Sequence, residues 1–128
     1  MSTPTSRSLV ECRNRGWECQ VVERWCQYSR RRIDLFGCID LIAIVPHDEI
    51  LGFGSILAIQ ACAGASHAAR RTKILAEPRM AKWLDAGGLL QIWSWAKRGA
   101  RGKRKVWCLR VEAIGARSDE PMQSGGKL

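Results

Sequence analysis

Two short apolar runs, joined by a segment rich in turn residues, constrain the fold of this chain more than any other feature. The first run covers residues 36–45 and the second covers residues 56–62, and both contain the branched side chains that favour strands. The segment between them contains a proline and two glycines, which is typical of a connection between antiparallel strands. We therefore expect a hairpin whose pairing is nearly symmetric about position 50.

One polar residue lies inside each of these runs, Asp40 in the first and Gln60 in the second. Pairing centred on position 50 places the two residues almost opposite each other on neighbouring strands. A carboxylate is costly to bury without a partner, so we expect Asp40 either to bind a ligand or to form an ion pair with one of the arginines at 30–32. The amide of Gln60 either belongs to the same site or is satisfied by backbone groups.

Periodicity and turn residues predict the other elements. In chain order we expect a helix at 6–15, a strand at 17–25, a loop at 26–34, strands at 36–45 and 56–62, a helix from Ser66 to residue 86 that Pro78 interrupts, a strand at 89–95, an exposed turn at 96–105 and a strand at 106–113. Helix, three strands, helix and two strands make a mixed α/β domain with an antiparallel hairpin at its centre.

The composition is that of one folded domain. Of the 128 residues 46% are hydrophobic and six are tryptophan, which is sufficient for a core. We expect a flexible leader at 1–5, a single domain at 6–114 and a disordered tail at 115–128. The tryptophans divide into two groups: Trp93 and Trp95 are expected in the core and Trp25 near the surface. The last strand is expected to point Trp107, Leu109 and Val111 inward and Arg110 and Glu112 outward.

The charge balance points to a polyanionic partner. Twenty-one lysines and arginines against twelve acids give a formal charge of +9, and such an excess on a small domain favours nucleic acid. The alternatives are solvated basic loops or an acidic protein partner, for example in a viral particle. The candidate nucleic-acid-binding residues are Arg30, Arg31, Arg32, Arg70, Arg71, Lys97, Arg98, Arg101, Lys103, Arg104 and Lys105.

The cysteines and histidines give weaker signals. The six cysteines include no C-x-x-C pair, so we expect buried free thiols instead of a zinc site. His47 and His67 have no partner in the sequence pattern, and we expect each at the surface or at a helix start. The chain contains no apolar run of membrane-spanning length and no secretory signal. We expect a soluble cytoplasmic protein with no membrane partner, or a virion-associated one if its source is viral.

This order of elements, with Asp40 early in the second strand and a polar pattern at the end of the third, resembles the core of the PD-(D/E)XK nuclease superfamily. Ile39-Asp40 stands at the Pro-Asp position of the family, and Gln60-Ala61-Cys62 stands at its Glu-x-Lys position. The spacing is most similar to that of archaeal Holliday-junction resolvases and of small phage-type members. The resemblance implies a restriction-endonuclease-like core, a homodimer, and hydrolysis of DNA phosphodiester bonds, on branched or duplex DNA, with Mg²⁺ or Mn²⁺ as the cofactor.

The resemblance also implies roles for individual residues. Asp40 would hold the metal and Gln60 would contribute its carbonyl oxygen, while Glu11 is the first candidate for a further acidic ligand and Glu23 the second. Cys62 stands where the family has a lysine, and a thiol cannot replace an ammonium group. Lys73 or Arg70 of the following helix would then supply the cation, with Lys73 as the catalytic candidate. The departures at Gln60 and Cys62 leave an alternative, a nuclease-fold protein that has lost catalysis and serves as a nucleic-acid-binding or structural module.

Overall fold

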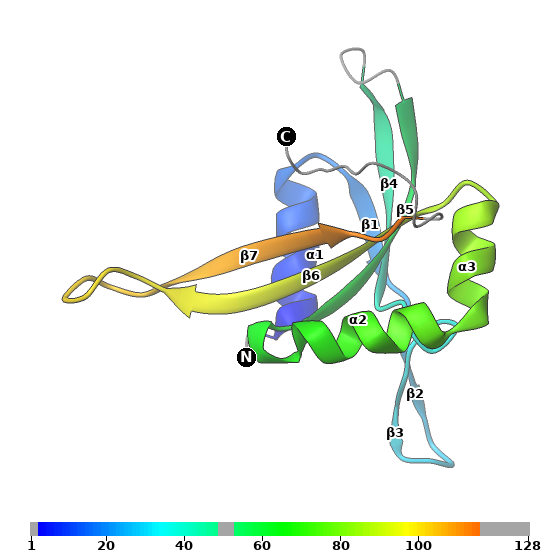
Figure 1. Cartoon of the computed structure of the whole chain (residues 1–128), viewed down its shortest axis with the longest axis horizontal. Coiled ribbons are helices and arrows are strands. Elements are labelled where there is room, and N and C mark those ends of the chain that lie inside the picture. The colour runs from blue at the N-terminus through cyan, green and yellow to red at the C-terminus, as the bar shows by residue number, and fades with distance from the viewer. Residues whose placement is uncertain (1–2, 49–52, 116–128) are drawn as a thin grey trace.

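The computed structural model describes residues 3–48 and 53–115, which form an α/β fold around one mixed sheet (Figure 1). The five strands of the sheet lie in the order β1–β4–β5–β6–β7. Their bounds are β1 (Glu18–Val21), β4 (Leu41–Asp48), β5 (Phe53–Ala63), β6 (Leu89–Arg98) and β7 (Val106–Ala113). A separate two-stranded sheet pairs β2 (Arg24–Cys26) with β3 (Arg31–Ile33), and the helices are α1 (Pro4–Asn14), α2 (His67–Ala76) and α3 (Pro78–Asp85), with a short 3-10 turn, η1 (Gly64–Ser66), before α2.

The central hairpin has the predicted register. Leu41 pairs with Ile59 and Ile44 pairs with Ile56, so the pairing is symmetric about position 50. The first strand of this hairpin, β4, begins at Leu41, later than predicted. Phe36 and Gly37 both adopt positive φ and form a tight turn before it. Asp40 therefore lies at the entrance of β4, where its N–H donates to the carbonyl of Ile59 at 2.9 Å.

The sheet is mixed because one of its strand pairs is parallel. β1, β4 and β5 form an antiparallel meander, β6 runs parallel to β5, and β7 returns antiparallel to β6. Parallel neighbours need a long crossover, which η1, α2 and α3 supply. As predicted, Pro78 interrupts the helical segment, and it starts α3 with the side chain of Glu77 accepting a capping bond from the Arg79 N–H. The predicted fold class is confirmed.

The helices cover opposite faces of the sheet, and a separate apolar cluster lies under each. Side chains of α1 and of one sheet face form the first cluster, which includes Cys12, Leu41, Leu57, Ile59 and Trp93. Side chains of α2, α3 and the other face form the second, which includes Cys38, Ala58, Cys62, Ile74, Met80, Leu90 and Ile92. Since successive strand residues point to opposite faces, Gln60 lies on the same face as Ala58 and Cys62, under α2.

The N-terminal part differs from the prediction in three places. The helix α1 begins at Pro4, where Thr3 and Ser6 form a capping box, so residues 4 and 5 are not a flexible leader. The predicted strand at 17–25 is two strands in different sheets, β1 and β2. The predicted loop at 26–34 contains β3, and the chain folds back there as the β2–β3 hairpin. The rest of the predicted leader and of the predicted tail, residues 1–2 and 116–128, lies outside the described residues.

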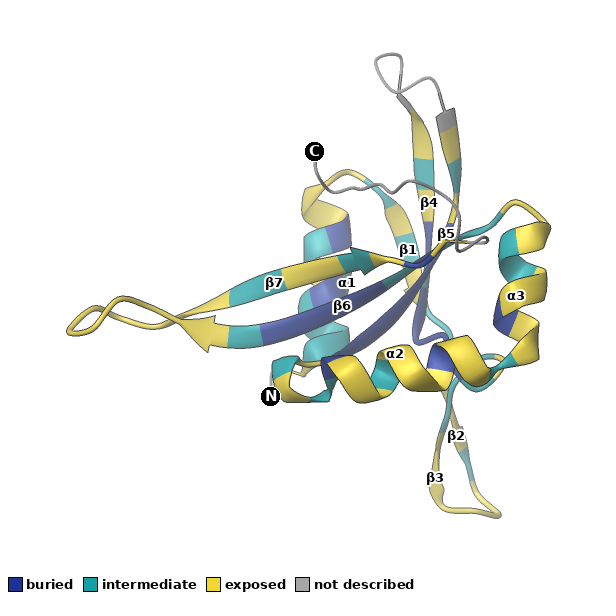
Figure 2. Ribbon diagram, in the orientation of Figure 1, coloured by how far each residue is buried: buried dark blue, intermediate teal, exposed yellow. Residues whose placement is uncertain are grey.

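The last two strands form a long hairpin that extends from the body of the fold (Figures 1 and 2). β6 continues to Arg98, so the first part of the predicted turn at 96–105 is strand. Trp107, Leu109 and Val111 lie on the face under α1 as predicted, but Trp107 and Val111 remain 44% and 41% exposed. The reason is that β7 is an edge strand, and α1 covers only part of the face on which these side chains lie.

The burial predictions for the tryptophans are confirmed, and the prediction of buried free thiols is confirmed in part. Trp93 and Trp95 are buried and Trp25 is exposed, and all six cysteines are free, three of them buried. In the two described stretches, no helix is both long and apolar enough to cross a membrane.

Candidate metal centre

Three carboxylates converge at the entrance of β4. One oxygen from each of Glu23, Asp34 and Asp40 lies within 4.8 Å of the others, and these three residues could hold a metal ion. The backbone brings them together: the Val22 N–H donates to the Asp40 carbonyl, which places Glu23 beside Asp40. A bond from the Leu35 N–H to the carbonyl of Ile39 returns the chain after Asp34 to the same point. Glu23 directly precedes the β2–β3 hairpin and Asp34 directly follows it, so both acids lie at the base of the hairpin.

Asp40 is the most deeply buried member of this acidic cluster. Its Oδ2 accepts hydrogen bonds from Gln60 Nε2 at 2.7 Å and from the Ala61 N–H at 2.8 Å. Burial raises the pKa of Asp40 to about 8, and a hydrogen bond and the negative charge of Asp34, with the charge of Glu23, act in the same direction. The two neighbouring carboxylates thus oppose the ionisation of Asp40. A bound cation would remove that conflict.

The side-chain oxygen of Gln60 is not used in the hydrogen bond to Asp40. Its Nε2 donates to Asp40 Oδ2, the arrangement that an ionised, metal-binding carboxylate requires because such a group only accepts hydrogen bonds. Its Oε1 is fully buried and has no hydrogen-bond partner among the described residues. Three carboxylates and an unpartnered carbonyl oxygen are hard oxygen donors, the type that Mg²⁺ and Mn²⁺ prefer. The donor set therefore fits a divalent cation.

Two cations flank the acidic cluster. Lys73 Nζ of α2 lies 3.7 Å from Asp34 Oδ2, and Arg32 Nη1 of β3 lies 3.2 Å from Glu23 Oε2. Lys73 is thus beside the carboxylates, where sequence reasoning placed a replacement cation. Arg70 lies close enough to Cys62 that its positive charge opposes the rise in the pKa of that thiol which burial causes.

The structure brings together a different set of acids from the one first expected. Glu11, the first candidate for a further ligand, is not part of the cluster and forms an ion pair at 2.9 Å with Arg15 along α1. Helix acids readily form such i,i+4 pairs. Glu23, the second candidate, is a member. Asp34 was missed, and the signal available was its position between an arginine run and an apolar run. The ion pair expected for Asp40 with the arginines at 30–32 is formed instead by Glu23 and Arg32.

The predicted nucleic-acid-binding residues fall on three elements. Arg30, Arg31 and Arg32 lie on the β2–β3 hairpin, Arg70 and Arg71 on α2, and Lys97, Arg98, Arg101, Lys103, Arg104 and Lys105 at the end of the β6–β7 hairpin. All are exposed except Arg70, which is half-buried. Figure 2 shows the two hairpins extending from the body of the fold in different directions, almost wholly exposed at their tips. The basic residues therefore lie on accessible elements, and of the predicted nucleic-acid-binding residues Arg32 lies directly against the acidic cluster.

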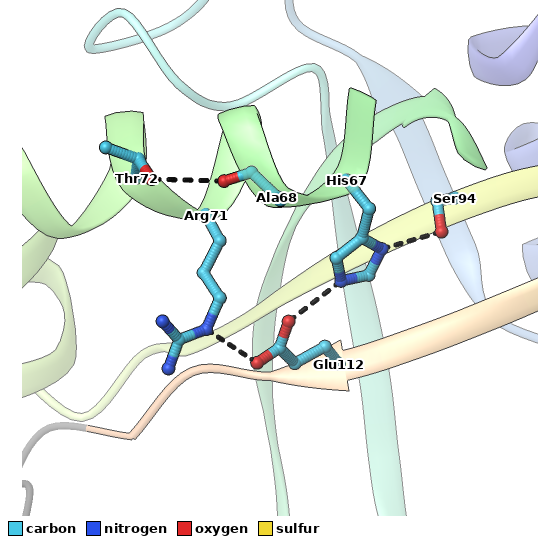
Figure 3. Close-up of polar contacts among 6 residues, drawn as sticks. All are labelled: His67, Ala68, Arg71, Thr72, Ser94 and Glu112. Atoms are coloured by element: carbon cyan, nitrogen blue, oxygen red, sulfur yellow. Dashed lines mark hydrogen bonds and ion pairs between the residues drawn. The ribbon is translucent and has the colours of Figure 1, made fainter. Parts of the chain in front are cut away.

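A second polar group joins α2 to the last two strands (Figure 3). His67 Nδ1 lies 2.7 Å from Ser94 Oγ and its Nε2 lies 2.8 Å from Glu112 Oε1, while Arg71 Nε donates to Glu112 Oε2 at 2.8 Å. Burial disfavours ionisation of Glu112, but hydrogen bonds from His67 and Arg71 outweigh it and lower the pKa of that carboxyl. His67 starts a helix as expected but is buried. Since Ser94 is buried as well, we interpret this group as a structural link.

Comparisons of the chain with protein-family models, with curated proteins and with solved structures find no match.

Proposed function

We propose that this protein is a metal-dependent endonuclease that hydrolyses DNA phosphodiester bonds at the acidic cluster of Glu23, Asp34 and Asp40. The observation that carries the proposal is the convergence of three carboxylates within 4.8 Å on a protein of net charge +9. Three carboxylates this close disfavour one another's negative charge, and a bound divalent cation would offset that repulsion. A cation at that place would in turn face the phosphates that the basic hairpins attract.

The fold supports the proposal. A helix, an antiparallel meander, a helical crossover and a further parallel strand are the elements that the resemblance to PD-(D/E)XK nucleases implies, and Asp40 stands at the entrance of the second meander strand, in the position of that family's aspartate. The family's glutamate position is occupied by Gln60, and Glu23 and Asp34 would supply the missing acidic ligands.

Each residue of the site has a distinct task. Glu23, Asp34 and Asp40 would hold Mg²⁺ or Mn²⁺, with Gln60 Oε1 as a further oxygen donor; such an ion polarises a phosphate and lowers the pKa of a bound water. Lys73 would offset the negative charge that develops on the phosphate, the task of the lysine that Cys62 replaces. Arg32 would bind the neighbouring phosphate of the DNA strand. Gln60 and the Ala61 N–H fix the orientation of Asp40.

One specific observation favours the alternative, a nuclease-fold protein that binds nucleic acid without cleaving it. The Gln60 amide already donates a hydrogen bond to Asp40, and Lys73 already forms an ion pair with Asp34. These two acids therefore have partners within the protein before any metal or substrate binds. A third option, a structural protein of a virion, shares the same basic surface. The homodimer that the resemblance implies belongs to the nuclease proposal, and sedimentation velocity of the purified chain tests it.

Cleavage assays separate these functions. Supercoiled plasmid, single-stranded DNA and a four-way junction are incubated with the protein in Mg²⁺, Mn²⁺ or EDTA. We expect metal-dependent cleavage that falls at least a hundredfold in Asp40→Asn and Asp34→Asn and at least tenfold in Lys73→Met. Glu18→Gln, which changes an exposed acid on β1, is the matched control and should retain activity. Wild-type protein that binds these DNAs but cleaves none of them with either metal would exclude the nuclease and leave the binding module.

A further inference from the structure

The β2–β3 hairpin exposes two aromatic side chains among arginines. Trp25 is 55% exposed and Tyr28, in the turn, is fully exposed. Residues 24–33 contain four arginines and no acid. Two exposed aromatic side chains among four arginines give this hairpin the composition of a stacking platform for nucleic-acid bases.

The strand register aligns these groups with the acidic cluster. Trp25 pairs with Arg32 across the hairpin, so the indole and the guanidinium lie on the same face. Arg32 in turn reaches Glu23 at 3.2 Å. An aromatic ring, a guanidinium group and a carboxylate of the cluster therefore follow one another along one face of the hairpin.

The hairpin and the acidic cluster are also joined covalently. Glu23 directly precedes β2 and Asp34 directly follows β3, so the two strands rise from two of the three carboxylates. A base stacked on Trp25, two residues after Glu23, is therefore held close to the base of the hairpin, where the acids lie. A nucleic-acid strand bound by the hairpin would therefore lie near the acids that are proposed to cleave it.

We propose that the β2–β3 hairpin binds an unpaired nucleic-acid strand, with bases stacked on Trp25 and Tyr28 and phosphates on Arg24, Arg30, Arg31 and Arg32. This deepens the proposed function, on which it rests, by naming its substrate class as single-stranded DNA or the unpaired part of a branched one. Unpaired bases expose the faces that stack on aromatic rings, whereas a duplex keeps those faces inside its own stack. A uniform duplex would use the arginines alone.

The test measures binding in EDTA, where cleavage is not needed. Fluorescently labelled oligothymidylate and a blunt duplex of equal length are titrated with the full chain. We expect Trp25→Ala and Tyr28→Ala each to weaken oligothymidylate binding by about tenfold and duplex binding by less than twofold. Trp25→Phe and Tyr28→Phe keep an aromatic ring and should retain most of the affinity. Phe36→Ala removes an exposed aromatic ring outside the hairpin and should change neither affinity.

A second readout guards against variants that fail to fold. Indole fluorescence of the wild type should be quenched by oligothymidylate, and the Trp25→Phe variant should lose most of that quenching while its circular dichroism stays native. Alanine variants that weaken single-strand and duplex binding equally, or that weaken neither, would overturn the proposal, as would a wild type that binds only the duplex.

Failure here is distinguishable from failure of the nuclease. Single-strand binding that depends on Trp25, in a protein that cleaves nothing, rejects the nuclease and keeps the hairpin assignment. Metal-dependent cleavage of single-stranded and branched DNA that Trp25→Ala and Tyr28→Ala leave unchanged rejects the hairpin assignment and keeps the nuclease.

Discussion

Gln60 Nε2 donates a 2.7 Å hydrogen bond to Asp40 Oδ2 across the central hairpin, and both side chains are buried. The bond satisfies the carboxylate but does not neutralise it, because an amide carries no charge. Asp34 and Glu23 add negative charge nearby. The pair is therefore well oriented and electrostatically costly, which is the combination expected of a site prepared for a cation.

The first prediction concerns the pH dependence of stability without metal. Folding raises the pKa of Asp40 from an ordinary 3.8 to about 8, so between these values the folded chain retains a proton that the unfolded chain has lost. The contribution of Asp40 to stability is therefore lost as pH rises through this interval. Asp40→Asn removes that loss, so its free energy of unfolding should rise relative to that of the wild type by at least about 1 kcal/mol between pH 5 and pH 8. Urea unfolding in EDTA measures it, and parallel pH profiles of the two proteins would contradict it.

A second prediction concerns the buried histidine. His67→Ala removes two hydrogen bonds and leaves Ser94 buried without a partner, so we expect a loss of about 2–4 kcal/mol in the free energy of unfolding. Ser94→Ala should cost about 1 kcal/mol. Thr72→Ala lies on the exposed side of the same helix and should stay within about 0.5 kcal/mol of wild type. Equal losses for His67→Ala and Thr72→Ala would show that the link does not stabilise the fold.

A third prediction concerns Glu112, the carboxylate that joins His67 and Arg71, which should make the stability of the fold sensitive to acid. The pKa of Glu112 is lowered in the folded protein, so the folded chain binds this proton less readily than the unfolded chain does. Its stabilising contribution is therefore present above the ordinary pKa of 4.5 and is lost as pH falls below it. Glu112→Gln should be less stable than wild type at pH 6 and approach it at pH 3. Chemical denaturation at both pH values tests this, and a constant difference would contradict it.

Two adjacent residues of α2 provide a matched test of the core. Ile74 is 1% exposed and packs against the sheet, whereas Leu75 is 58% exposed. Ile74→Ala should therefore cost about 2–5 kcal/mol through lost burial and a residual cavity. Leu75→Ala should change stability by about 0.5 kcal/mol or less. Thermal unfolding of both variants tests which face of α2 packs on the sheet. A larger loss of stability in Leu75→Ala than in Ile74→Ala would contradict the described orientation of the helix.

The central hairpin was predictable because two independent signals agreed. Branched side chains defined the strands, and the turn residues between them fixed a register that places Asp40 opposite Gln60. The break at Pro78 followed from the geometry of one residue. These features depend on short-range physics, which a sequence displays directly.

The missed features depend on contacts that the sequence does not display. The strands β2 and β3 are only three residues long, so β2 was predicted as the end of a longer strand and the arginine-rich β3 as a loop, and Asp34 was missed with β3. Alternation along β7 shows two faces but not how far α1 covers one of them, and Trp107 remains 44% exposed beneath Arg7. His67 meets Ser94 and Glu112 only through tertiary packing. For the same reason a helix acid, Glu11, was preferred to Glu23, whose position depends on the hairpin fold.

The single parallel joint between β5 and β6 has a consequence for how the chain folds. The meander and the β6–β7 hairpin each consist of strands that are neighbours in sequence or nearly so, whereas the joint between them must wait for the whole helical crossover to close. Contacts of high sequence separation form late because loop closure costs entropy first. We therefore expect the two halves of the sheet to form early and independently, and their joining to limit the folding rate. Pulsed hydrogen exchange during refolding would show this as late protection of the amides shared by β5 and β6.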